Sequence, residues 1–180
     1  MLTKISKAEL LNRYAAGERN FTASDLTGLD LTGVSLSGIN LSRSVLTRAD
    51  CTEADLSDSI LLSANLSSTI LNRANLNRAN LTRANISRSL LTKASLESAL
   101  LLQADLSGAI MIQANLQKAR CRKANLNNTN LRSANLQQAN LDHIIYNRES
   151  LFPEGFDIPL PSLGKGLRER DYGDNAGWKF

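Results

Sequence analysis

The stretch from Ala74 to Ile86, Ala-Asn-Leu-Asn-Arg-Ala-Asn-Leu-Thr-Arg-Ala-Asn-Ile, decides the fold because it repeats a unit of five residues. The same spacing extends in both directions. From Phe21 to Leu141 an apolar residue stands at every fifth position, over 24 steps of five without an insertion. A small residue, most often alanine, stands two positions earlier, and the residue between them is most often Asp or Asn. A repeat this regular fixes the fold class before local propensities are considered.

A period of five fits neither a helix nor a continuous strand. On an α-helix, residues five apart lie ~140° from each other, so the leucines would form no apolar stripe. On a continuous strand an odd spacing sends alternate leucines to opposite faces. The chain must therefore turn once in each repeat.

Each repeat is predicted to form a short extended piece followed by a corner. Because residues two apart share a face, the small residue and the leucine point inward and the Asp or Asn between them points outward. Asn and Asp suit that site because their short side chains bond turn backbone. Four corners close a loop of about twenty residues, and about six loops stack at strand spacing into a rod ~30 Å long.

The run from Ala74 to Ile86 resembles the pentapeptide-repeat family, and the resemblance covers 125 of the 180 residues, 21 to 145. It implies an all-β fold, a right-handed quadrilateral β-helix (β-solenoid). The motif is specific for fold and unspecific for function. The family includes interaction scaffolds and DNA mimics that protect topoisomerases.

The two ends break the period, which predicts three parts: 1–18, 19–146 and 147–180. In 1–18, a capping box at Ser6 and Glu9 and a stop at Gly17 predict a short helix that covers the first loop. In 147–180, three prolines end the coil. Phe152, Phe156 and Ile158 are expected to fold over the last loop as an irregular cap, and 163–180 are expected to be mobile.

Charge is divided along the repeat region. Residues 21–60 hold six acids and two bases (net −4), whereas residues 61–145 hold ten bases and three acids (net +7). Consecutive basic residues such as Arg73, Arg78 and Arg83 fall on consecutive corners, so they circle the rod as a solvated coat. A DNA mimic needs a long acidic surface, and nucleic-acid binding favours one basic face with aromatics. The basic charge disfavours nucleic-acid or topoisomerase-directed binding, which is the alternative function.

Nothing in the sequence indicates catalysis, so we expect no enzyme activity, no small-molecule substrate, no metal and no cofactor. His143, the only histidine, is expected at the surface or in a cap. Cys51 and Cys121 take the place of inward leucines ~17 Å apart along the axis, too far for a disulfide. No secretory or membrane-spanning run is present, which predicts a cytoplasmic protein with no membrane partner.

The departures from the repeat give the candidate site. Aliphatic residues replace the outward Asp or Asn at Ile70, Leu90 and Ile110, which are twenty apart and so stack on one face, and Ile112 extends it. We expect these four residues to form an exposed contact surface, which predicts a non-catalytic scaffold that binds another protein. Two alternatives stay open: the side chains only stiffen the loops, or the C-terminal tail covers them. The sequence fixes neither the partner nor the oligomeric state. On the opposite face, Ile60 and Leu100 are accompanied by Leu62 and Leu102.

Overall fold

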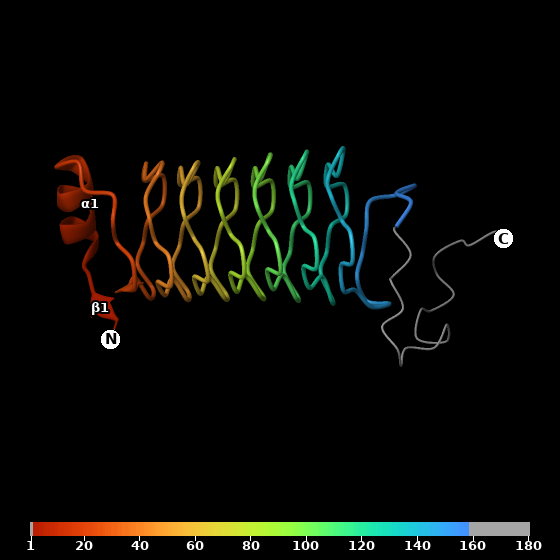
Figure 1. Ribbon diagram of the computed structural model, residues 1–180, viewed down its shortest axis with the longest axis horizontal. Helices are drawn as coiled ribbons and strands as arrows, with labels where there is room; N and C mark the ends of the chain where they lie inside the picture. Colours follow the sequence, from red (N-terminus) through yellow and green to blue (C-terminus); the bar gives the residue numbers. More distant parts are fainter. Residues whose placement is uncertain (1, 159–180) are drawn as a thin grey trace.

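The computed structural model describes residues 2–158, and in it the chain winds as a coil whose turns stack along one axis (Figure 1). Parallel backbone bridges join outward residues twenty positions apart, from Asn20–Asn40 to Asn125–Ile145. Each extended piece is so short that most pairing consists of isolated bridges. The described residues contain only two strands, β1 (Thr3–Lys4) and β2 (Ser24–Asp25). The predicted β-helical coil of four five-residue sides is therefore confirmed.

The core is the stack of inward residues. Every residue at the five-residue spacing is buried, from Phe21 at 2% exposure to Leu141 at 5%. The alanines two positions earlier are also buried, except that Ala139 is half-buried near the C-terminal end. Burying one leucine contributes about 1.5–3 kcal/mol, so the row of apolar side chains is the main source of stability.

In the middle coils, a repeat whose outward residue is asparagine has an acceptor for every backbone N–H group. Two N–H groups donate to the following coil, one to the preceding coil, and one closes the corner. The fifth is taken by the asparagine side chain, as Asx turns require. In repeat 75–79 the acceptors are Ala54 O (2.9 Å), Ser95 O (2.7 Å), Asn75 Oδ1 (3.1 Å), Glu97 O (2.9 Å) and Leu76 O (3.1 Å).

The corners carry a backbone feature that the five-residue period does not reveal. The third residue of each turn has a positive φ, as at Arg48 (φ 60°), and Ala49 N closes that turn on Leu46 O at 2.9 Å. This combination belongs to a type II turn, which favours glycine at the third position. Glycine stands there at Gly108 (φ 66°) and at three early corners, but most corners carry other residues.

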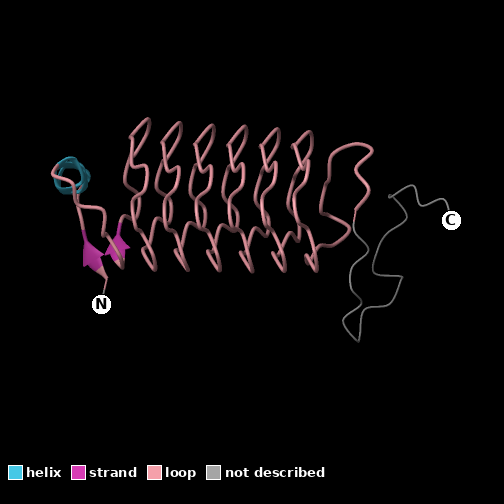
Figure 2. Ribbon diagram, turned by 45° about the horizontal axis from the view of Figure 1, so that its top comes forward, coloured by secondary structure: helices cyan, strands magenta, loops and turns pink. Residues whose placement is uncertain are grey.

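A helix and a short strand cover the N-terminal end of the coil. Helix α1 spans Lys7–Ala15, and the Ser6 side chain accepts a hydrogen bond from Glu9 N at 3.2 Å. Leu10 of this helix is completely buried against the core. Ahead of it, β1 pairs in parallel with β2, and Figure 2 shows the two strands side by side. The sequence pattern predicts the helix but not the strand.

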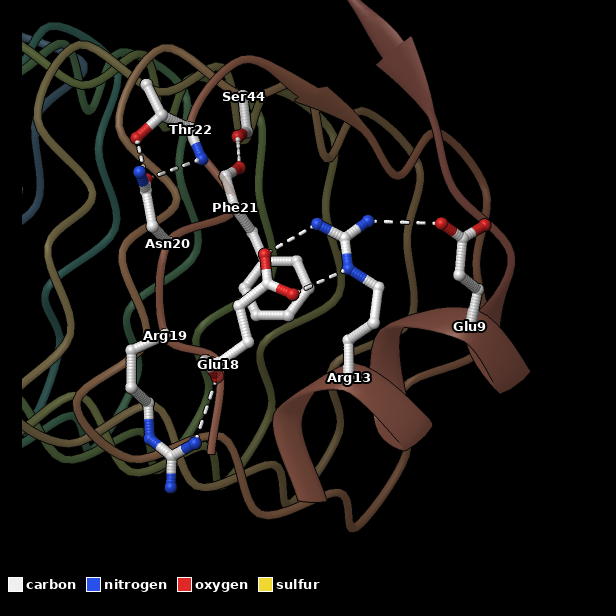
Figure 3. Close-up of polar contacts among 8 residues, drawn as sticks. All are labelled: Glu9, Arg13, Glu18, Arg19, Asn20, Phe21, Thr22 and Ser44. Atoms are coloured by element: carbon white, nitrogen blue, oxygen red, sulfur yellow. Dashed lines mark hydrogen bonds and ion pairs between the residues drawn. The ribbon is translucent and has the colours of Figure 1, made fainter. Parts of the chain in front are cut away.

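Arg13 ties the helix to the first coil (Figure 3). Its guanidinium bonds both carboxylate oxygens of Glu18, at 2.8 and 2.6 Å, and reaches Glu9 at 3.0 Å. It also lies 4.9 Å from the centre of the Phe21 ring, in a cation–π position. The hydrogen bond from Arg13 holds the pKa of Glu18 below its usual range.

At the C-terminal end, pairing continues past residue 146. Asn130 bridges Leu151, a spacing of twenty-one instead of twenty, so one extra residue is accommodated in the last coil. Phe152 packs edge-on against Tyr146 (5.5 Å between ring centres) and stacks on Phe156 (6.1 Å). Ile158 is half-buried. The mobility expected for 163–180 concerns a segment outside the described residues.

Candidate functional site

The three predicted ladder residues stack as expected on one side of the coil. Backbone bridges join Ile70 to Leu90 and Leu90 to Ile110, so their side chains lie in register on three successive coils. Leu90 is 36% exposed and Ile110 is 37% exposed, while Ile70 and Ile112 are half-buried. We refer to Ile70, Leu90, Ile110 and Ile112 as the aliphatic ladder.

Polar residues bound the aliphatic ladder along the rod. On the same side, Asp50 bridges Ile70 from the preceding coil and Asn130 bridges Ile110 from the following coil. The apolar surface is therefore confined to three coils, with a carboxylate at one end and an amide at the other. The two ends of the apolar surface therefore differ in charge along the rod.

A side chain from the neighbouring coil replaces the turn hydrogen bond that Leu90 cannot supply. With leucine at the outward site, the N–H of Thr92 has no Asx acceptor in its own repeat. Asn72 Oδ1 accepts it at 3.0 Å from the coil before. Asn77 plays the same part for Glu97 N (2.9 Å), where Ser95 holds the outward site. Of the three ladder corners, the one at Leu90 is thus held by a contact between coils that the sequence pattern did not predict.

An open hollow of about 380 Å³ runs beside the aliphatic ladder, along the adjoining corner. Arg73 projects there and pairs with Glu53 of the preceding coil at 3.0 Å, with both side chains more than half exposed. An exposed pair of this kind contributes little to stability but orients the two side chains. The hollow is lined by Thr52, Asn72, Arg73, Thr92 and Lys93.

The described residues offer no arrangement suited to metal binding: no group of three His, Cys, Asp or Glu side chains converges between residues 2 and 158. A second hollow, of about 480 Å³, lies between the last coil and the C-terminal cap near Gln138 and Phe156. The two cysteines are buried, and burial raises the pKa of each thiol to about 12. A thiol in that state is a poor nucleophile and a poor metal ligand at neutral pH.

Stacking pairs the early acids with the first arginines of the basic region. Besides the Arg73–Glu53 pair, Arg78 forms a bidentate pair with Asp58, at 2.7 and 2.6 Å. This contact lowers the pKa of Asp58 and raises the pKa of Arg78. The positive charge left without an acidic partner in the described coils is therefore concentrated in the later ones.

Within the part of the chain that the structure describes, no helix has both the length and the apolar character needed to cross a bilayer.

Several solved structures are similar to this chain. A pentapeptide repeat protein (Rfr23) from the cyanobacterium Cyanothece 51142 is 25% identical, covering 79% of this chain and 96% of the other, with a TM-score of 0.47. A pentapeptide repeat protein from the thylakoid lumen of Arabidopsis thaliana is 24% identical (59% and 70% covered, TM-score 0.46). HetL, from the cyanobacterium Nostoc sp. strain PCC 7120, is 28% identical (78% and 94% covered, TM-score 0.27). No curated protein matched the sequence.

The family assignment rests on the repeat itself. The family model described as pentapeptide repeats matches eight copies, in overlapping segments at residues 24–61, 60–97, 89–120 and 109–145. Together these segments run from 24 to 145, well over half of the 180 residues. They coincide with the coils whose leucines are buried and whose outward residues bridge at a spacing of twenty. The chain therefore belongs to the pentapeptide-repeat family.

Proposed function

We propose that this protein is a non-catalytic scaffold that binds another protein through the aliphatic ladder. The observation that carries the proposal is the register of Ile70, Leu90 and Ile110, which places aliphatic side chains on three successive coils where the repeat otherwise prefers Asn or Asp. Right-handed winding of the coil and a cytoplasmic location belong to the same proposal. The first is supported by the family and the second by the sequence.

The outward aliphatic residues lack the side-chain acceptor that the repeat otherwise provides, which supports a role in contact. At Leu90 the hydrogen bond within the repeat, worth about 0.5–1.5 kcal/mol, is replaced by one to Asn72 of the neighbouring coil. An exposed aliphatic side chain gains stability chiefly when a partner covers it, at about 25 cal/mol per Å² of apolar area. Contiguous apolar patches on a soluble surface often mark a site of interaction.

The aliphatic ladder alone is smaller than a standard protein–protein interface, which buries about 800 Å² on each partner. The partner must therefore extend past the ladder, over Asp50, Asn130 or the hollow that contains Arg73. The ladder would then be the apolar centre of the contact and the polar residues around it the rim. Substitutions in the ladder should weaken binding more than substitutions in the rim.

The test is the triple variant Ile70→Asn, Leu90→Asn, Ile110→Asn, which installs the repeat's own preferred residue and should keep the coil intact. A matched control, Val45→Asn with Ile145→Asn, removes outward aliphatic residues from an adjacent side. Affinity purification from the native cell and multi-angle light scattering compare partners and oligomeric state. The proposal requires that the triple variant alone loses a partner or changes its assembly. If all three proteins keep the same partners and state, the ladder only stiffens the coil.

A further inference from the structure

A second surface lies on the side of the coil opposite the aliphatic ladder. There Ile60 is 41% exposed and Leu62 is 37% exposed, and the pair Leu100 and Leu102, two coils further, is half-buried. Bridges run from Ile60 through Asn80 and Leu100 to Arg120, so all of these outward residues lie in one column. We refer to six residues as the basic–apolar face: Ile60, Leu62, Leu100, Leu102, Arg120 and Arg122.

Cations collect at one end of the basic–apolar face. Arg120, Arg122 and Lys123 are exposed on a single coil, directly after Leu100 and Leu102. None of the three forms an ion pair with an acid among residues 2–158, whereas Arg73 and Arg78 each have one. The arginine at position 120 also stands where the repeat prefers asparagine. Because Arg120 lies in the same column as Leu100, its charge adds to those of Arg122 and Lys123 to form a local basic patch beside the apolar residues.

We infer that the basic–apolar face binds an acidic amphipathic helix of another protein. The two apolar pairs are two coils apart, ~9.6 Å at strand spacing. Residues seven apart on a helix lie on the same side and ~10.5 Å apart, which matches this distance. Same-face residues on an extended peptide lie ~6.6 or ~13.2 Å apart, which does not. One coil beyond the second pair, ~4.8 Å further, carboxylates one helical turn later would meet Arg120 and Arg122.

Two other kinds of anionic partner fit the face less well. The most exposed apolar side chains of the face are Ile60 (41%) and Leu62 (37%). They lie on a flat side of the coil, so they do not project far enough to enter a bilayer. The face has no aromatic side chain on which a base could stack, and its cations occupy one end only. An acidic helix uses both the apolar pairs and the cations at once.

The test uses a fluorescein-labelled 18-residue helical peptide with leucines at positions 4 and 11 and glutamates at positions 14 and 15. Fluorescence anisotropy should show binding in the micromolar range that weakens as salt is added. An isomer with residues 11 and 13 exchanged places its leucines on opposite sides of the helix and should bind at least about tenfold more weakly. Anionic vesicles with 30% phosphatidylserine and a 20-base-pair DNA duplex serve as the competing anions.

Two variants locate the binding on the protein. One variant combines Arg120→Glu with Arg122→Glu, and the other combines Leu100→Asn with Leu102→Thr. Each should weaken binding of the peptide by about tenfold or more. The triple ladder variant should bind it normally, which separates this inference from the proposed function. The inference is overturned if the peptide fails to bind at 1 mM, if both isomers bind equally, or if neither variant weakens binding. It is also overturned if vesicles or duplex bind more tightly than the peptide through the same residues. Circular dichroism and thermal melting verify that every variant is folded.

Discussion

Replacing Gly108 by alanine should destabilise the protein, and replacing Ser63 by glycine should stabilise it. Both residues occupy the third position of a corner turn, with φ of 66° and 54°. A left-handed backbone is free of strain for glycine and costs an L-residue with a side chain about 1–2 kcal/mol. The two substitutions therefore change the strain of the corner backbone in opposite directions, at two corners that lie on different coils.

The size of the effect follows from the surroundings of Gly108. A Cβ atom added there would meet only Arg88 Cγ, at 3.6 Å, which is ordinary van der Waals contact. The cost is then the backbone term alone, about 1–2 kcal/mol, reduced by about 0.4–1 kcal/mol because alanine also restricts the unfolded chain. The net loss should be about 1 kcal/mol, and Ser63→Gly should gain about the same amount.

Urea unfolding followed by circular dichroism measures both changes. With a slope of about 2.5 kcal/mol per molar urea, 1 kcal/mol shifts the midpoint by about 0.4 M, downward for Gly108→Ala and upward for Ser63→Gly. The slope should stay constant, since neither change alters the buried core. Ala109→Gly, one residue along and inward-facing, is the control and should destabilise through lost burial. A neutral Gly108→Ala, or midpoints that move the same way, would show that the corners store no backbone strain.

Four further outcomes follow from buried and charged groups. Ser59 Oγ is buried with no hydrogen-bond partner among the described residues, so Ser59→Ala should be neutral or stabilise by up to about 1 kcal/mol. Ser44 Oγ bonds a carbonyl and an amide of the neighbouring coil, so Ser44→Ala should cost about 1–2 kcal/mol in the same urea assay. Both cysteine thiols, with pKa raised to about 12, should resist Ellman's reagent at pH 8 until the protein is unfolded; rapid reaction of the native protein would contradict their burial. The hydrogen bond from Arg13 lowers the pKa of Glu18, so this carboxylate stabilises the fold fully above its ordinary pKa of 4.5. The contribution is lost as the pH falls below that value. Between pH 6 and pH 2, the melting temperature of Glu18→Gln should therefore drop less than that of the wild-type protein.

The five-residue period predicts everything that depends only on which way a side chain points. Leu91 and Ala94 are buried, Asn75 is outward and bonds its own turn, and Leu90 falls between Ile70 and Ile110, all from counting. Counting works because a coil of fixed length converts sequence separation directly into position. The place of the ladder residues needed no further information.

Features that depend on backbone conformation or on contacts between coils could not be predicted from the five-residue period. Arg48 and most corner residues adopt a left-handed conformation although their side chains give no sign of it, because the turn geometry overrides local preference. The pairing of β1, and the extra residue that brings Leu151 opposite Asn130, occur where the period has ended. Arg120 could have been placed above Leu100 by the same count of twenty. The structure was needed to show that Asp142, one coil further, accepts a hydrogen bond from Asn140 and forms no ion pair with Arg120 or Arg122.

The spacing of twenty between bridged residues makes chain length equivalent to an angle. Deleting one five-residue unit, 76–80, would leave a well-packed coil, because leucine still follows leucine inside. Everything downstream would nevertheless rotate by a quarter turn, so Leu90 and Ile110 would move to the neighbouring side and no longer lie above Ile70. Deleting four consecutive units would restore the phase and only shorten the rod. Insertions and deletions in this chain can therefore dismantle or create surface patches without a single substitution and without disturbing the core.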